Sequence, residues 1–414
     1  MIQLYIDPGT GSMLFTILVG ILGAGIYAAR GLVMKLRFVL SGGKAEKTDR
    51  KAVPFAIFTD SKRYWNMFGP ICREFDKRGQ ELLYLTASPD DPALQEKFDH
   101  VRCEFAGEGN RAYARLNMLS ADVLLSSTPG LDVYQWKRSK DVKWYVHIPH
   151  AVTDVTCYRM FGIDYYDTVM LTGEYMYDRV RELEQLRNLP AKELPIVGLP
   201  YMDEMLKRKE AAGPVPAHPT TVLLAPSWGK SSILNRYGED IFKALLATGY
   251  HIIVRPHPQS FTSEKELLER LQKAYPDSDQ LEWNSDNDNF QVLRRSDILI
   301  SDFSGVTFDF SLVFDKPIIY ADTSFDKGPY DAYWMKEEPW MFTALPRIGQ
   351  QLTKENLGSI KKVIDTCMKD PKYQQGRDQV RKESWDHIGH SVEKTVDYMM
   401  EKYSQLHAET RTGV

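Results

Sequence analysis

Polar residues that could bind an anion follow directly on a short apolar run near the middle of the second half of the chain. The run at residues 298–300 is typical of a strand buried on both faces of a parallel sheet. A helical pattern begins at Val306, and an N-terminus that follows such a strand offers unpaired N–H groups and a positive dipole end. The sequence therefore predicts a phosphate or diphosphate site, although an ordinary helix cap without a ligand is the commoner use of such residues. Its candidate residues are Ser301, Asp302, Ser304 and Gly305.

A cation and an imidazole follow another predicted strand, at residues 251–254. These are Arg255 and His257 in the segment RPHP. Because the carboxyl ends of parallel strands meet at one edge of a sheet, we expect both to converge on the same anion. The polar loop Ser227, Trp228 and Gly229 follows a predicted strand at residues 221–226 and is expected to lie over a nucleotide. It lacks the first glycine of a Walker phosphate loop, which excludes nucleoside triphosphatase chemistry.

The segments RPHP and SDFSGVTFDFSLVFDKPIIY, at residues 255–258 and 301–320, resemble the CDP-glycerol glycerophosphotransferase family, the teichoic-acid primases and polymerases. The family usually reads Asp-Tyr-Ser-Ser before a helix with an internal Asp. In this chain Phe303 stands for the Tyr and Gly305 for the second Ser. The resemblance covers residues 55–320 and implies two Rossmann-like domains of GT-B type that face a cleft. It also implies CDP-glycerol as the donor and CMP as the leaving group.

A second region, WYVHIPHAVTDV at residues 144–155, resembles the family's strand-ending Trp-His-Gly-Thr segment, whose His is the proposed base. On that pairing His150 is the matching residue, and Ala151 replaces the usual Gly. An imidazole with an ordinary pKa near ~6.5 can accept a hydroxyl proton at neutral pH. His147, three residues earlier, is a competing candidate, and a lone histidine more often has a structural role. The resemblance thus predicts His150 and His257 as the catalytic residues.

The composition excludes several other classes of function. The chain has 414 residues, of which 43% are hydrophobic and 26% charged, enough for two domains. Lys and Arg number 52 against 56 Asp and Glu, so the net charge of −4 does not favour nucleic-acid binding. The four cysteines lack a CxxC pair, which argues against a zinc site and a disulfide framework. They are Cys72, Cys103, Cys157 and Cys367. We expect no metal, no cofactor and a reducing compartment.

The N-terminal 40 residues predict a membrane anchor. Residues 13–29 carry no charge, and their length is at the lower limit for spanning a bilayer. Cations follow this stretch, beginning at Arg30, which places the body of the protein on the cytoplasmic side by the positive-inside rule. The expected localisation is the cell membrane, as a single-pass protein or, if the stretch is an interfacial helix, a peripheral one. Residues 41–54 read as a charged linker.

Alternating strands and helices predict an α/β fold with two Rossmann-like domains. Residues 55–210 form the N-terminal acceptor domain, 211–219 a linker and 220–384 the C-terminal nucleotide-donor domain. A helical pattern at residues 383–403 places a helix within 385–414 that crosses back to the first domain. The aromatic run at residues 330–340 lines an acceptor groove or covers the core. The predicted strands are residues 55–58, 81–86, 121–126, 142–147, 167–171, 195–200, 221–226, 251–254, 298–300 and 318–320.

These observations lead to one expected function and two alternatives. The leading hypothesis is transfer of glycerol phosphate from CDP-glycerol to a hydroxyl of a lipid-linked or polymeric glycan acceptor at the membrane. A GT-B glycosyltransferase or an epimerase acting on a UDP-sugar is the first alternative, because one fold serves many reactions. A membrane-anchored protein that binds a nucleotide or glycan without catalysis is the second. The sequence leaves open the acceptor, the choice between glycerol and ribitol phosphate, and whether the chain forms a homo-oligomer.

Overall fold

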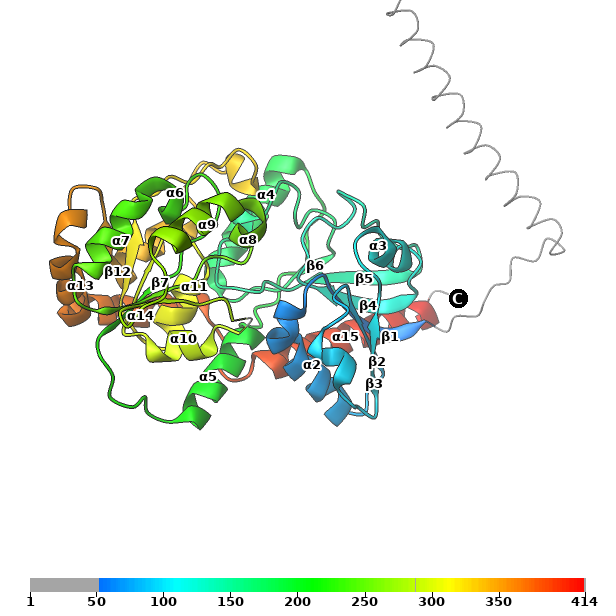
Figure 1. The fold of residues 1–414 in the computed structure, drawn as a ribbon. Helices are drawn as coiled ribbons and strands as arrows, with labels where there is room; N and C mark the ends of the chain where they lie inside the picture. Colours follow the sequence, from blue (N-terminus) through cyan, green and yellow to red (C-terminus); the bar gives the residue numbers. More distant parts are fainter. Residues whose placement is uncertain (1–51, 287, 413–414) are drawn as a thin grey trace, which may run out of the picture. The chain divides into compact units, whose positions relative to one another are not determined.

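Two six-stranded parallel sheets organise the computed structural model, which describes residues 52–286 and 288–412 (Figure 1). We call the half built on the first sheet the first lobe and the half built on the second sheet the second lobe. The spatial orders are β3-β2-β1-β4-β5-β6 and β12-β11-β10-β7-β8-β9. Counted within its own lobe, each sheet has the strand order 3-2-1-4-5-6 of a doubly wound Rossmann fold. The α/β class and the two Rossmann-like domains of GT-B type are thereby confirmed.

The strands of the first sheet are β1 (Val53–Thr59), β2 (Leu82–Thr86), β3 (Val101–Phe105), β4 (Ala121–Ser126), β5 (Val142–His147) and β6 (Thr168–Val169). Those of the second sheet are β7 (Thr221–Leu224), β8 (His251–Val254), β9 (Leu281–Trp283), β10 (Ile298–Ser301), β11 (Ile318–Ala321) and β12 (Gly349–Leu352). The short strands β3, β9 and β12 were not predicted. Residues 195–200, predicted as a strand, form only an isolated bridge between Ile196 and Leu171 before a helix begins at Pro200.

Helices cover both faces of each sheet. Around the first sheet lie α2 (Trp65–Lys77), α3 (Asn110–Leu116), α4 (Tyr177–Arg187), α5 (Pro200–Ala212) and α15 (Ser391–Thr412). The second lobe contains α6 (Ile233–Tyr237), α7 (Glu239–Leu246), α8 (Ser260–Ser263), α9 (Lys265–Ala274), α10 (Phe290–Arg295), α11 (Val306–Phe308), α12 (Trp340–Ile348), α13 (Ile360–Lys369) and α14 (Pro371–Ser384). A π-helical turn, Asp309–Val313, follows α11 directly.

The alternation of side chains along a strand explains why both faces are covered. In β1, Phe55 and Ile57 pack into one hydrophobic cluster, whereas Ala56 and Phe58 pack into another on the opposite face. All four are at most 1% exposed. Strands of this kind read as continuous apolar runs, which is why the central strands were predictable from sequence.

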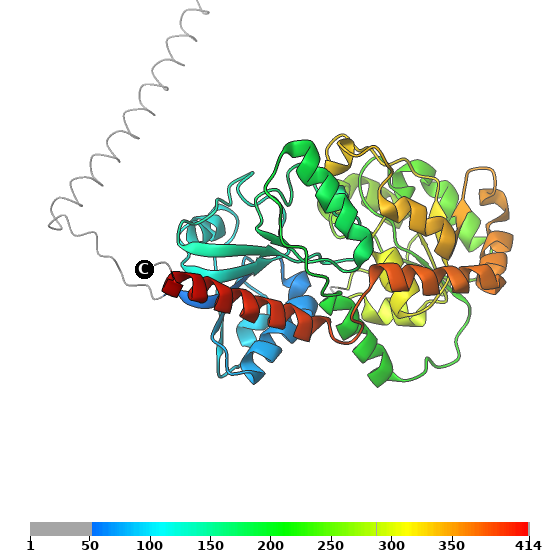
Figure 2. The same ribbon diagram turned by 180° about the vertical axis from the view of Figure 1, so that it is seen from behind.

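The C-terminal helix α15 lies against the first lobe, in front of α2 in the view of Figure 2. Its Val396 and Met399 are fully buried in the same cluster as Phe55. The predicted single helix at residues 383–403 is wrong, because α14 ends at Ser384 and α15 begins at Ser391. A turn with positive φ angles, 49° at His387 and 80° at Gly389, separates the two helices.

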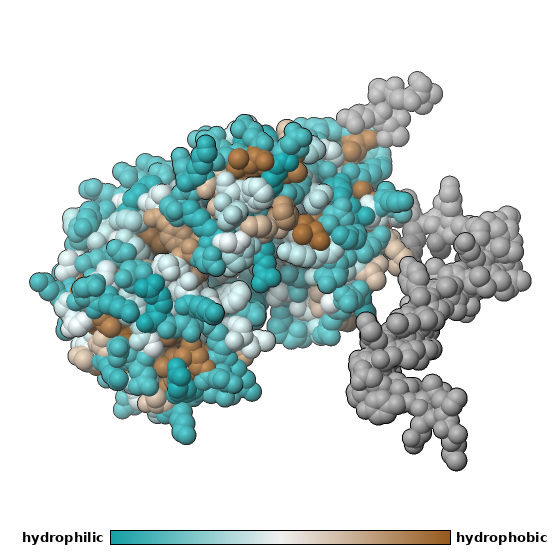
Figure 3. All heavy atoms as spheres, turned by 90° about the horizontal axis from the view of Figure 1, so that it is seen from above, coloured by the Kyte–Doolittle hydropathy of each residue, from teal (hydrophilic) through white to brown (hydrophobic). Residues whose placement is uncertain are grey.

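Residues 52–286 and 288–412 include no helix that combines the length and the apolar character needed to cross a membrane. The predicted anchor at residues 1–40 lies outside the described residues, as does most of the predicted linker at residues 41–54. Figure 3 shows a mainly hydrophilic face with small, separate hydrophobic patches.

Candidate functional site

A pocket of about 450 Å³ lies where the carboxyl ends of strands from both lobes meet. This is the edge at which open α/β folds bind ligands. The second lobe contributes Ser227 after β7, His257 after β8 and the Ser304–Gly305 turn after β10. The other residues that line the pocket, from both lobes, are Pro129, His150, Thr153, Asp154, Cys157, Tyr158, Arg159, Trp228, Phe303, Phe325, Tyr330 and Met341.

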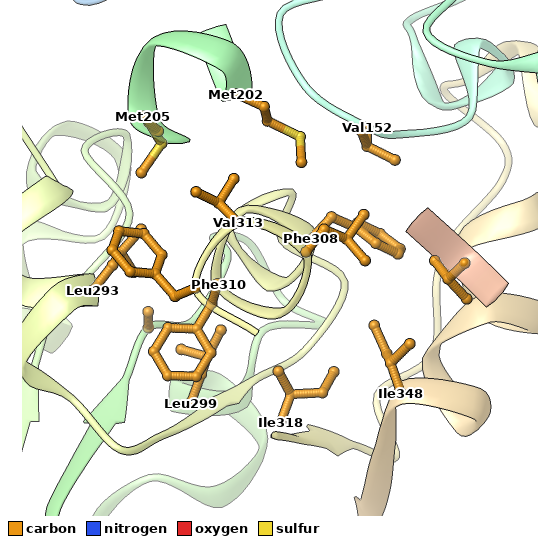
Figure 4. Packing of buried hydrophobic residues seen from close by; sticks show 14 of the residues in the cluster. Val152, Met202, Met205, Leu293, Leu299, Phe308, Phe310, Val313, Ile318 and Ile348 are labelled. Carbon is orange, nitrogen blue, oxygen red and sulfur yellow. The ribbon is translucent and has the colours of Figure 1, made fainter. Parts of the chain in front are cut away.

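The loop that carries His150 is fixed directly against the predicted anion site. Val152 has no exposed surface and packs in the hydrophobic cluster that contains Phe308 of α11 and Met202 of α5 (Figure 4). A Cβ atom built on Gly305 would lie 3.3 Å from the Cβ of Ala151 and 3.4 Å from the Cγ2 of Thr153. Glycine at position 305 therefore allows the two lobes to approach closely here.

This contact joins the two positions at which the sequence departs from the family pattern. Ala151 carries a methyl group where the family has Gly, and Gly305 lacks a side chain where the family has Ser. The two positions are in direct contact, so the methyl group of Ala151 occupies space that a side chain at position 305 would need. On this geometry we expect the two departures to compensate each other.

The structure distinguishes the two candidate histidines of this region. His147 is the last residue of β5, is fully buried and lies 3.2 Å from the Tyr158 hydroxyl through its Nε2. His150 lines the pocket instead, and its ring packs 5.0 Å from Tyr64 and 6.4 Å from Tyr158, measured between centroids. Its Nδ1 is buried and makes no hydrogen bond within the described residues. A ligand in the pocket could satisfy this atom.

Burial makes both histidines neutral at pH 7. It lowers the pKa of His150 to about 4 and that of His147 to about 3. The expectation of an ordinary pKa at His150 is therefore wrong for the ligand-free protein. A neutral imidazole still has a lone pair with which to accept a proton.

His257 lies on the opposite wall of the pocket. Its Nδ1 accepts a hydrogen bond from the Gln259 amide at 3.1 Å, so the neutral ring carries its proton on Nε2. Burial, with a smaller contribution from the nearby charge of Arg63, lowers the pKa of His257 to about 4. The ring thus acts at neutral pH as an uncharged donor of one hydrogen bond.

Asp302 and Ser301 were predicted to bind substrate, but their side chains bond to the backbone of the second lobe. The buried carboxylate of Asp302 accepts hydrogen bonds from the amides of Ser227, Ile233 and Phe303 at 2.8 to 3.1 Å. The Ser301 hydroxyl donates to the Ala225 carbonyl at 2.6 Å. Neither residue lines the pocket, and Asp302 instead holds the loop that begins at Ser227.

That loop presents Ser227 and Trp228 to the pocket. The Ser227 hydroxyl is buried and makes no hydrogen bond within the described residues, so a ligand group could pair with it. The indole of Trp228 is 37% exposed and lies 6.5 Å from the His257 ring. Gly229 lies outside the pocket wall, and its amide donates to Glu264 at 3.0 Å. Its φ of +89° explains the glycine at this turn.

Arg255 is not on the pocket wall either. Its guanidinium group contacts the Asn284 side chain and donates to the Asp286 carbonyl at 2.7 Å. Burial lowers its pKa. The arginine therefore shapes the end of β9 next to the site, and any contact with a ligand would require this network to rearrange.

The sequence indicated only in part the section of the pocket formed by residues 325–331, since Tyr330 belongs to the aromatic run expected to line a groove or cover the core. Met160 and Asp331 donate backbone hydrogen bonds to Pro329 and Tyr158, at 3.1 and 2.9 Å, across the two lobes. Arg187 is buried between Asp164 and Asp331 and donates to Asp164 at 2.6 Å. This ion-paired contact positions Tyr330 in the pocket wall. The only signal in the sequence was the aromatic run at residues 330–340, and nothing in it indicates a partner far along the chain.

Comparison with known protein families decides the classification. The model of the family described as CDP-Glycerol:Poly(glycerophosphate) glycerophosphotransferase matches residues 163–387, more than half of the chain. The chain belongs to this family. The matched residues include Ser227, His257 and the Ser304–Gly305 turn, whereas His150 precedes them. A comparison with curated proteins finds no match.

Solved structures share the fold of this glycerophosphotransferase family member. A UDP-GlcNAc 2-epimerase from Methanocaldococcus jannaschii, in complex with UDP-GlcNAc and UDP, aligns with a TM-score of 0.56 at 12% identity and covers 84% of this chain and 99% of its own. A putative UDP-N-acetylglucosamine 2-epimerase from Listeria monocytogenes aligns with a TM-score of 0.56 at 10% identity, covering 86% and 97%. At such identities the likeness shows the fold alone.

Proposed function

We propose that the protein transfers glycerol phosphate from CDP-glycerol to a hydroxyl of a lipid-linked or polymeric acceptor of the teichoic-acid type and releases CMP. The observation that carries this proposal is the contact between the His150 loop and the Ser304–Gly305 turn. In this contact the loop that carries His150, the proposed proton acceptor, packs against the turn that we take as the anion site, within one pocket of a chain that belongs to this family.

The proposed reaction is a single in-line displacement at phosphorus. The acceptor oxygen attacks the phosphorus that carries glycerol, while the bond from this phosphorus to the bridging oxygen breaks. CMP leaves with that electron pair, and the acceptor proton passes to His150. The Nε2–H group of His257, the Ser227 hydroxyl and the amides of Ser304 and Gly305 stabilise the charge that develops on the leaving phosphate.

The pocket's electrostatics suit this sequence of events. A free imidazole with a pKa of about 4 is a weak base, but a bound diphosphate brings negative charge close to His150 and His257. An opposite charge nearby favours the protonated form and raises the pKa. Donor binding would therefore raise the proton affinity of His150 at the stage when the acceptor proton must be removed.

Kinetics of histidine variants test these roles. We expect His150→Ala to lower kcat by ~10²–10⁴ with little change in the dissociation constant for CDP-glycerol. His257→Ala should weaken donor binding and also lower kcat by ~10²–10³. His390→Ala, at an exposed residue between α14 and α15, is the matched control. A large loss in His147→Ala with a preserved fold, and none in His150→Ala, would refute the assignment of the base.

Membrane attachment through residues 1–40, with the catalytic body on the cytoplasmic side, is a separate proposal supported by the sequence alone. The uncharged stretch at residues 13–29 and the cations after it are the supporting observations. Alkaline carbonate extraction of membranes that contain the full chain is the test. Release of the protein into the soluble fraction would contradict a spanning anchor.

A further inference from the structure

Two arginines are the sequence neighbours of the two tyrosines that pack against the His150 ring. The ring packs between Tyr64 and Tyr158, at centroid distances of 5.0 and 6.4 Å. Arg63 directly precedes the first tyrosine, and Arg159 directly follows the second. Both belong to the first lobe, the lobe that would present the acceptor to the donor.

Among the described residues, neither guanidinium group has a protein partner. Both side chains are exposed, and neither makes an ion pair or a side-chain hydrogen bond within residues 52–286 and 288–412. Neighbouring cations are engaged: Arg187 with Asp331, and Lys327 with Glu338 at 2.7 Å. An exposed arginine solvated by water is ordinary on a protein surface, so the position of these two is what matters.

Their position links them to the reaction site. Arg159 lines the pocket itself. Arg63 lies close enough to the second lobe that its charge lowers the pKa of both His257 and Arg255. Arg159 can therefore act directly on an anion in the pocket, and the charge of Arg63 reaches the same cleft from the first lobe.

We propose that Arg63 and Arg159 form an acceptor subsite, which binds phosphodiester groups of an anionic acceptor chain and directs its terminal hydroxyl to His150. A planar guanidinium group pairs with two phosphate oxygens at once, so it orients the chain as well as attracting it. The inference rests on the proposed function, in which the second lobe holds the donor diphosphate. With His257 and Ser304 on that lobe, the first-lobe arginines remain available for the acceptor.

The subsite also predicts which acceptors the protein prefers. An oligo(glycerol phosphate) offers a phosphate next to its terminal glycerol, whereas a neutral glycan offers none. Attraction between exposed charges weakens as salt screens them, with a Debye length of about 10 Å at 0.1 M. Binding of the anionic acceptor should therefore weaken with rising ionic strength, while use of a neutral hydroxyl acceptor should not.

Steady-state kinetics of the full chain test the subsite. The variants are Arg63→Gln, Arg159→Gln and the double variant, with Arg270→Gln, an exposed arginine of α9 in the second lobe, as the matched control. The readouts are KM for a defined oligo(glycerol phosphate), KM for CDP-glycerol, and release of CMP by hydrolysis without acceptor. Losing one charge-assisted pair should raise KM for the oligomer about 10-fold, and the double variant about 100-fold. KM for the oligomer should rise far more than KM for CDP-glycerol.

Two outcomes in the double variant would overturn the subsite. The first is an unchanged KM for the oligomer. The second is a raised KM for CDP-glycerol together with slower hydrolysis, which would assign the arginines to donor binding. Equilibrium binding of the oligomer to wild type and double variant keeps this test independent of turnover. Loss of binding in the double variant supports the subsite even if wild type releases no CMP, a result that would refute the proposed function alone. Equal binding by both proteins refutes the subsite.

Discussion

Adding one methyl group at Gly305 should separate the base from the anion site. In Gly305→Ala the new Cβ would lie 3.3 Å from the Ala151 Cβ and 3.4 Å from the Thr153 Cγ2. Carbon atoms prefer about 3.5–4.0 Å, so the His150 loop must shift by a few tenths of an ångström. Overpacking of this kind costs about 1–3 kcal/mol. Since a misplacement of about 1 Å can cost ~10² in rate, we expect kcat to fall about 10-fold.

A double-mutant cycle isolates this contact. Ala151→Gly removes the methyl group that Gly305→Ala meets, so the double variant should recover much of the lost kcat and stability. The assays are kcat for CMP release and the free energy of unfolding from denaturant titration. Gly358→Ala, where a Cβ would have nothing within 4 Å, is the control. Purely additive effects, with a coupling below about 0.3–0.5 kcal/mol, would refute the argument that the two positions compensate each other.

Three further predictions concern charge and hydrogen bonding at the site and between the lobes. Because the neutral form of His150 must accept the proton, kcat/KM should fall only as the pH drops through about 4. The acid limb of the kcat profile should lie at higher pH, since bound diphosphate raises the pKa of His150. Identical acid limbs in the two profiles would contradict this. Asp302→Asn should lower the free energy of unfolding by about 1.5–3 kcal/mol and raise KM for CDP-glycerol, because the amides of Ser227 and Ile233 lose a charged acceptor. An unchanged denaturation midpoint and an unchanged KM would count against this role of Asp302. Asp331→Asn should cost about 1.5–3 kcal/mol, because buried Arg187 loses one of its two carboxylate partners and keeps Asp164. The exposed Asp178→Asn should leave stability unchanged, and equal midpoints for both variants would show that the Arg187–Asp331 pair does not hold the lobes together.

The sequence predicted those parts of the site that follow buried strands. Continuous apolar runs such as residues 298–300 identify central parallel strands, and polar residues after them lie at the carboxyl edge of the sheet. The Ser304–Gly305 turn and His257 line the pocket for this reason. Which polar side chain faces the pocket was not predictable, because Ser301 and Asp302 have equally suitable chemistry but bond to the backbone.

Contacts between residues far apart in the chain account for what the sequence did not show. His147 and His150 differ in burial, and this depends on how the residues after β5 leave the sheet. The Arg187–Asp331 pair and the packing of Val152 beside Phe308 join lobes through residues with no shared local pattern. No periodicity or motif within a short window reports such pairs.

The fate of the phosphorus atom that carries glycerol tests the central claim most directly. The full-length protein would be incubated with CDP-glycerol labelled with ³²P on that phosphorus, together with an acceptor that ends in a free hydroxyl. The account predicts that the label appears in a new phosphodiester of the acceptor, with unlabelled CMP released in equal amount. Release of labelled CDP, or turnover of UDP-GlcNAc but not of CDP-glycerol under the same conditions, would contradict it.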